Sequence, residues 1–198
     1  MRDPEDTRRQ APRPLAFARD AKRAVGALVR DSLALATADR GANEASAQAA
    51  IATGRVIGIA RKPRHRGPME MLDRAEITTE SGLVGNANGR PGRRQVTVLT
   101  REGWDAACRE LGREVGWGTR RANLWIEGIA VARRVGARLV IGEVVLEITG
   151  ETTPCSRMDA QVPGLTSALT PDWRAGVTCR VVHGGTVRLG DVVGIASP

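Results

Sequence analysis

Short runs of alternating apolar and polar residues dominate the chain after residue 54. The segment Gln95-Val-Thr-Val-Leu-Thr100 alternates with a period of two, which is typical of a β-strand with one buried face. We predict further strands, separated by turns that often contain glycine, at residues 55–60, 75–79, 123–127, 138–141, 144–149, 176–183, 186–188 and 192–195. Many short strands with glycine turns indicate a mainly β fold with a few short helices, either a β-barrel or a β-sandwich.

The pattern changes to a helical period directly after the strand at 95–100. The buried face of this predicted helix carries residues at spacings of three and four: Trp104, Ala107, Cys108 and Leu111. Thr100 is suited to cap its N-terminus. We predict a second short helix at 163–169, with Pro163 at its start.

Residues 1–53 differ from the rest and form a predicted N-terminal extension. Residues 1–14 are charged and interrupted by prolines, which is typical of a disordered segment. A partial apolar stripe predicts a helix at 15–38, with a loosely ordered segment as the alternative. We therefore expect an extension at 1–53, helical or disordered, followed by one β domain at 54–198.

Arginine accounts for most of the chain's positive charge. The chain has 30 basic and 22 acidic residues, a net charge of +8, with lysine at Lys22 and Lys62 alone. Arginine binds phosphate or carboxylate through two parallel hydrogen bonds, so an anionic ligand is one explanation and a GC-rich genome is the other. Tyrosine is absent and Phe17 is the single phenylalanine, whereas single-strand nucleic-acid platforms need stacked aromatic side chains. A basic polyanion-binding module is thus a remote alternative, and we expect no nucleic-acid partner.

The sequence also indicates a compartment. No apolar run approaches the roughly 20 residues that a membrane-spanning helix needs, and no signal-peptide pattern opens the chain. Three cysteines without close pairing fit a reducing environment. We expect a cytoplasmic protein with no membrane partner. The two histidines, His65 and His183, are too few and too distant for a zinc site.

Cys155 differs from the other two cysteines in its sequence surroundings. Cys108 lies on the buried face of the predicted helix and Cys179 alternates along a predicted strand, so packing explains both. Cys155 follows Pro154, belongs to no periodic pattern and precedes Arg157 by two residues. A thiol on such a turn can act as nucleophile, metal ligand or sulfur donor. The alternative is a small apolar residue that fills space beneath a loop.

Two basic loops precede predicted strands. The glycine-rich loop at 82–95 contains three arginines, including Arg94, whose donors could cradle an anion. It is not a P-loop, because the lysine and following Ser/Thr are absent. The loop at 118–124 carries Arg120, Arg121 and Asn123 at a strand entrance. Each loop considered alone is equally explained as a solvated basic surface.

The order of the motifs is more specific than any one of them. Along the chain they read GL-x-G with RRQV, R-x-x-NL-x-x-EGI, RL-x-IG-x-VVLEIT, PCSRMD, PGL-x-x-AL, WRAGV-x-x-RV and GD-x-V. In this order they resemble the MOSC domain, named for the C-terminal domain of molybdenum-cofactor sulfurases, over residues 54–195. Standalone bacterial MOSC proteins are the most similar, and the mitochondrial amidoxime-reducing components are more distant. The resemblance implies a β-barrel and either binding of the molybdenum cofactor (molybdopterin) or transfer of activated sulfur.

The resemblance also implies roles for individual residues. Cys155 matches the family's hallmark cysteine, regarded as a molybdenum ligand or a persulfide carrier, and both roles need a soft deprotonated sulfur. The expected cofactor contacts are Arg94, Arg120, Arg121, Asn123 and Arg157. Of these, Arg120 or Arg121 and Asn123 match the family's arginine-to-asparagine step before a strand.

One departure from the family concerns the glycine-rich loop. The family usually has Gly-Asp there, often followed by histidine, whereas this chain has Asn86 and Asn88. A carboxylate and a titratable ring are lost, which weakens the case for proton delivery from the loop. Asparagine still forms hydrogen bonds, so the loop can keep its shape without that chemistry.

The resemblance leaves two functions open. Some relatives reduce N-hydroxylated bases or amidoximes with electrons from a separate flavin or iron–sulfur protein, and the cofactor would then act on a small-molecule substrate beside Cys155. Alternatively, Cys155 carries a persulfide that a separate cysteine desulfurase supplies, with no turnover of its own and no stably bound cofactor.

Overall fold

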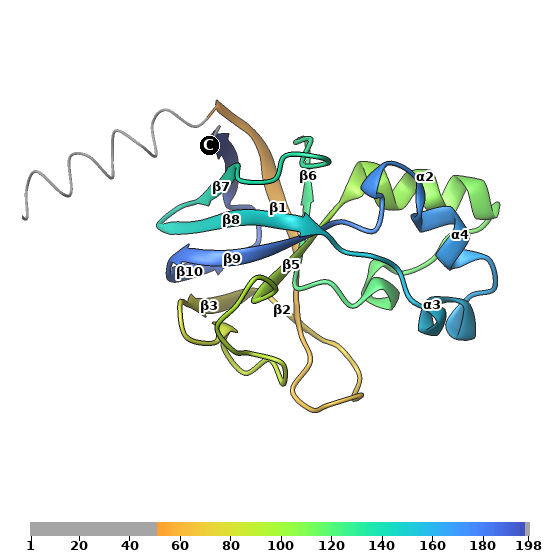
Figure 1. The fold of residues 1–198 in the computed structure, drawn as a ribbon, viewed down its shortest axis with the longest axis horizontal. Helices are drawn as coiled ribbons and strands as arrows, with labels where there is room; N and C mark the ends of the chain where they lie inside the picture. The colour runs from red at the N-terminus through yellow and green to blue at the C-terminus, as the bar shows by residue number, and fades with distance from the viewer. Residues whose placement is uncertain (1–50, 197–198) are drawn as a thin grey trace, which may run out of the picture. The chain divides into compact units, whose positions relative to one another are not determined.

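Among residues 51–196, which the computed structural model describes, seven strands close into a β-barrel (Figure 1). Strand β1 (Ile51–Arg61) closes the ring, because it pairs with both β11 (Val192–Ala196) and β6 (Leu124–Glu127). From β11 the ring continues through β7 (Arg138–Ile141), β8 (Val144–Glu151), β9 (Val177–His183) and β5 (Val96–Thr100) to β6. The predicted mainly β fold is confirmed, and of the two expected architectures it is the barrel.

The remaining strands lie outside this ring. The short β2 (Glu70–Leu72) pairs with the end of β1, and a separate sheet has the order β10 (Gly185–Arg188), β3 (Arg74–Thr78) and β4 (Gly82–Leu83). Every strand predicted from the sequence is present, with bounds that differ by a few residues. The sequence did not predict β2 or β4, because three and two residues are too short to show a period.

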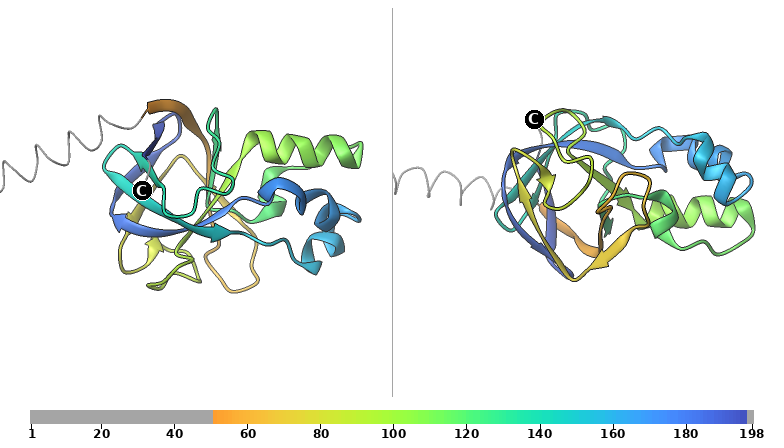
Figure 2. Two further views of the ribbon diagram at one scale, coloured as in Figure 1. Left: turned by 45° about the horizontal axis from the view of Figure 1, so that its top comes forward. Right: turned by 90° about the horizontal axis from the view of Figure 1, so that it is seen from below.

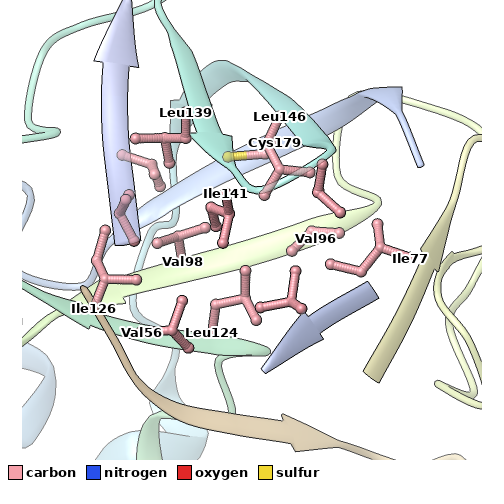
Figure 3. Close-up of a cluster of buried hydrophobic side chains, with 14 of the residues drawn as sticks. Val56, Ile77, Val96, Val98, Leu124, Ile126, Leu139, Ile141, Leu146 and Cys179 are labelled. Atoms are coloured by element: carbon pink, nitrogen blue, oxygen red, sulfur yellow. The ribbon is translucent and has the colours of Figure 1, made fainter. Parts of the chain in front are cut away.

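Apolar side chains from all seven barrel strands fill the interior (Figure 3). Leu124, Ile141 and Leu146 project into this cluster with no accessible surface. Burial of each such side chain contributes roughly 1.5–3 kcal/mol relative to exposure. Cys179 lies among them and is equally buried, so its predicted packing role is confirmed.

Helices gather beside the barrel rather than around it, as the three views of the ribbon agree (Figures 1 and 2). They are α2 (Arg101–Leu111), α3 (Ser156–Gln161), α4 (Leu165–Leu169) and the short 3-10 turns η1 (Trp117–Arg120) and η2 (Pro171–Trp173). A second apolar cluster joins them: Leu99, Trp104, Ala107, Cys108, Ala122, Met158, Val162, Leu165, Ala168, Leu169 and Ala175.

The predicted helix after the strand at 95–100 is confirmed as α2. Thr100 caps it, with its Oγ1 accepting the Gly103 N–H at 3.3 Å, and Cys108 faces the second apolar cluster as expected. The predicted helix at 163–169 begins later, at Leu165. Gly164 precedes it with φ of 84°, a left-handed conformation that favours glycine, so Pro163 does not start the helix.

The predicted helix at 15–38 lies outside the described residues, as does the predicted extension up to residue 50. The expected division of the chain into 1–53 and 54–198 stays a prediction.

Candidate functional site

A cavity of about 910 Å³ lies where four segments of the chain meet. They are the loop after β1, the glycine-rich loop before β5, the residues before β6 and the turn that leads into α3. All of the predicted site residues line it: Arg94, Arg120, Arg121, Asn123, Cys155 and Arg157. The structure therefore brings the two basic loops and the singled-out thiol into one site, while their individual roles stay predictions.

The registers of three barrel strands explain why these segments meet. Strand β1 runs antiparallel to β6 with Ile59 opposite Leu124, so the loop after β1 lies next to the residues that precede β6. Strand β5 runs parallel to β6 with Val98 opposite Leu124. Because the two strands run in the same direction, the basic loops that precede them emerge at the same end of the barrel.

Cys155 is exposed and precedes α3 directly, with extended backbone angles of φ −127° and ψ 163°. Its carbonyl oxygen accepts the Met158 N–H at 2.8 Å and the Thr166 hydroxyl at 3.2 Å. Asp159 also accepts the Thr166 N–H at 2.9 Å, which ties α3 to α4. The predicted turn at Cys155 is confirmed, and its backbone is fixed while its thiol faces the cavity.

The two other cysteines are free and buried. Burial raises the pKa of the Cys108 thiol above its usual value, and complete burial raises the pKa of Cys179 much further. Both sulfurs are held as neutral thiols at physiological pH. Cys155 is therefore the cysteine that is placed for chemistry.

Arg120 is the most buried cation of the cavity, with 6% of its surface exposed. Its Nε donates to the Ala175 carbonyl and its Nη2 to the Thr152 carbonyl, both at 2.8 Å. Burial first, and then repulsion from Arg94, lower the pKa of Arg120 to about 10. Arg120 stays protonated at neutral pH and fastens the segment that leads from β8 to Cys155.

Arg121 holds a different wall of the same cavity. Its backbone has φ of 63°, which few non-glycine residues adopt, and its Nη2 donates to the Gly67 carbonyl at 2.7 Å. Burial lowers the pKa of Arg121, and repulsion from Arg157 lowers it further. The loop after β1 is thereby anchored to the residues before β6.

Asn123 joins three strands through its amide and is 5% exposed. Its Oδ1 accepts the Thr97 N–H at 3.1 Å and the Thr97 hydroxyl at 3.0 Å, and its Nδ2 donates to the Ala60 carbonyl at 3.3 Å. Asn86 has a similar function in the glycine-rich loop, where its Oδ1 accepts the Lys62 N–H at 3.0 Å. Both side chains hold backbone in place, and contact of Asn123 with a cofactor stays a prediction.

The cavity lining is strongly positive. Seven basic side chains line it and no carboxylate does, within the part of the chain that the structure describes: Lys62, Arg90, Arg93, Arg94, Arg120, Arg121 and Arg157. None of the seven forms an ion pair there. The pKa of Lys62 is lowered first by burial and then by repulsion from Arg121, Arg157 and Arg94. An anion in the cavity would relieve this repulsion.

Two lining residues were missed in the sequence, Lys62 and His65, whereas Arg90 and Arg93 were predicted only as part of the anion-cradling loop. The run Lys62-Pro-Arg-His-Arg-Gly67 directly after a predicted strand was an available signal for the first two. In the glycine-rich loop this chain has Asn86 and Asn88 where the family often has aspartate and histidine. A histidine nevertheless lines the cavity, because His65 reaches it from the loop after β1.

Two further observations concern residues 51–196. No group of three His, Cys, Asp or Glu side chains among them is arranged to hold a metal ion. None of their helices is both long and apolar enough to cross a membrane.

The chain matches known proteins in family and in fold. The family described as MOSC domain matches residues 62–194. The YUAD protein from Bacillus subtilis is similar, with a TM-score of 0.64 and 19% identity, over 74% of this chain and 97% of its own. YiiM from Escherichia coli has a TM-score of 0.55 and 18% identity, over 73% of this chain and 70% of its own. YiiM from Geobacillus stearothermophilus has a TM-score of 0.52 and 15% identity, over 73% and 74%. Comparison with curated proteins gives no match.

Proposed function

Because the chain belongs to the MOSC domain family, we propose that it binds the molybdenum cofactor in the basic cavity, with Cys155 as a ligand of the metal. The observation that carries this proposal is the combination of one exposed thiol with a lining of basic side chains and no carboxylate. A thiolate is a soft ligand that suits such a metal, and arginine and lysine suit the phosphate of the pterin.

The residues present fit a group of this kind. Arg120 is a buried guanidinium that donates to carbonyl groups and, within residues 51–196, pairs with no carboxylate, so its charge adds to the positive potential of the cavity. Lys62 and Arg157 lie beside the same space and repel one another, which a phosphate would offset. Cys155 is exposed to this space while its carbonyl is held by two hydrogen bonds.

In this proposal the protein binds and orients, and the cofactor supplies a redox-active metal when it is bound. Cys155 holds the metal through its sulfur, and the basic side chains hold the phosphate. Arg120 and Arg121 keep the cavity walls in place through backbone carbonyls. The reaction we propose is reduction of an N-hydroxylated small molecule with electrons from a separate donor protein. Free cysteines fit the reducing conditions of the cytoplasm, where we propose the protein acts.

Metal analysis of protein expressed in a host that makes the cofactor tests this proposal. Wild-type protein is expected to contain molybdenum in proportion to chain, Cys155→Ala to lose it, and Cys108→Ala to keep it. The Cys108 variant is the matched control because that thiol is buried away from the cavity. Wild-type protein without molybdenum, or a Cys155 variant with a full complement, would contradict the proposal.

The exposure of Cys155 also favours a second function, that of sulfur carrier. The Cys155 thiolate would attack the outer sulfur of a persulfide on a partner desulfurase. A new S–S bond forms to Cys155, the bond within the desulfurase persulfide breaks, and the desulfurase thiolate leaves. Intact mass after incubation with a desulfurase and cysteine should show the gain of one sulfur atom on wild-type protein and none on Cys155→Ala. Absence of the gain on wild type would exclude this function.

A further inference from the structure

The seven basic side chains of the cavity fall into two groups by their hydrogen bonds. Three arginines donate to backbone carbonyls and are here called the wall arginines: Arg93 to Thr149, Arg120 to Ala175 and Thr152, and Arg121 to Gly67. Within residues 51–196 the other four side chains donate to no protein acceptor, and we call them the free cations: Lys62, Arg90, Arg94 and Arg157. The wall arginines build the cavity, whereas the free cations are available to a ligand.

Three of the four free cations, Lys62, Arg94 and Arg157, are crowded against one another or against the wall arginines. Lys62 is repelled by Arg94 and Arg157, Arg120 by Arg94, and Arg121 by Arg157. The cavity offers no carboxylate that would balance this charge, within the described part of the chain. Such an arrangement favours the binding of anions, and it disfavours any ligand that carries a positive charge.

One cofactor would not neutralise this lining. A phosphate group brings about two negative charges and a thiolate brings one more, against seven positive side chains. The cavity volume of about 910 Å³ lies near the upper end of the range that holds drug-sized ligands, so it leaves room beside a bound group. Positive charge and space therefore remain for a second ligand.

We propose that this cavity selects a small-molecule substrate that carries an oxyanion, a phosphate or a carboxylate, and that the free cations on the glycine-rich loop hold it. This inference rests on the proposed function. Arg90 and Arg94 are the candidates, because both are exposed on that loop and neither donates to an acceptor in the described part of the chain. A protonated amidine or other cationic base would meet repulsion without a balancing carboxylate, so the reducible N–O group belongs to a molecule with a negative tail.

Binding calorimetry with three matched probes tests the inference without measuring turnover. Molybdenum-loaded protein is titrated with benzamidoxime, with its para-carboxy derivative and with its para-aminomethyl derivative, which share the reacting group and differ in charge. The para-carboxy probe is expected to bind about tenfold more tightly than benzamidoxime, the order expected for one charge-assisted hydrogen bond, and the para-aminomethyl probe more weakly.

Variants assign the preference to residues. Arg90→Gln and Arg94→Gln should each reduce the preference for the para-carboxy probe, whereas Arg109→Gln removes the same charge from α2, outside the cavity, and should retain it. Equal binding of the three probes by loaded wild type, or a preference that both cavity variants retain, overturns the inference and leaves the proposed function standing. Protein that contains no molybdenum overturns both.

Discussion

The barrel interior and the basic cavity place the same residue type in opposite surroundings. Cys179 lies among the apolar side chains of the interior, where complete burial raises its pKa and keeps the thiol neutral. Cys155 lies exposed in a cavity lined by seven basic side chains. Apolar contacts define the first region, and unneutralised charge defines the second. The difference teaches that apolar packing holds the barrel together, whereas the cavity keeps positive charges that no carboxylate of residues 51–196 neutralises.

The largest effect on stability is expected from the interior. Leu146→Ala removes a side chain with no accessible surface and leaves a cavity among its neighbours. We expect it to lower the free energy of unfolding by about 2–5 kcal/mol, measured by denaturant titration. Val182→Ala on β9 is the control, since that side chain is exposed. Equal effects of the two substitutions would mean that the interior does not dominate stability.

Arg120 lines the cavity, but we expect its replacement to lower the stability of the fold, as replacement of an interior residue does. Arg120→Met removes charged donors from the Thr152 and Ala175 carbonyls and should cost about 2–4 kcal/mol of unfolding free energy. Arg94→Met removes a guanidinium that donates to no acceptor within residues 51–196 and should leave stability nearly unchanged. Denaturant titration gives the free energy of unfolding of both variants, and the difference between them distinguishes a wall arginine from a free cation. A costly Arg94→Met would contradict this division.

A pair of cysteine variants compares the two regions directly. Cys179→Ser buries a hydroxyl among apolar side chains and should lower the free energy of unfolding by about 1–3 kcal/mol. Cys155→Ser changes an exposed side chain and should leave it nearly unchanged. Thermal unfolding of both proteins gives the comparison. A Cys155 variant as unstable as the Cys179 variant would favour the interpretation of Cys155 as a packing residue.

Alkylation of Cys155 is expected to have the smallest effect on the stability of the fold. Native protein treated with iodoacetamide should be modified at Cys155 and not at Cys108 or Cys179, because the latter two are buried and protonated. Peptide mass mapping identifies the site, and the melting temperature of the modified protein should match that of the untreated protein. Modification of Cys179 under native conditions would show that the interior opens readily.

The interior could be predicted from the sequence because its signal is local. Strand alternation identified Cys179 as a packing residue, and helical spacing did the same for Cys108. Strand pairing was not predictable, because the pairs are distant in sequence. Strand β1, at the start of the domain, pairs with β6 near its middle and with β11 at its end. The pairing of β1 with both strands makes the fold a barrel rather than a sandwich, and no local sequence pattern indicates this pairing.

The cavity was predictable only in part, because its residues come from loops that the pairing brings together. Motif order identified Cys155 and the arginines before β6, and all of them line one cavity. The sequence could not show that Arg120 donates to backbone carbonyls while Arg94 donates to no acceptor among residues 51–196, since both are arginines in basic loops. Lys62 was not among the predicted site residues, because the cavity residues next to it, Arg94, Arg121 and Arg157, are distant in sequence.

The most direct test of the account is anomalous diffraction at the molybdenum absorption edge from crystals of protein purified from a cofactor-competent host. We expect a single anomalous peak in the basic cavity at bonding distance from the Cys155 sulfur, with phosphate density beside Lys62 and Arg157. A peak elsewhere on the molecule, or loaded protein whose metal does not contact Cys155, would contradict it.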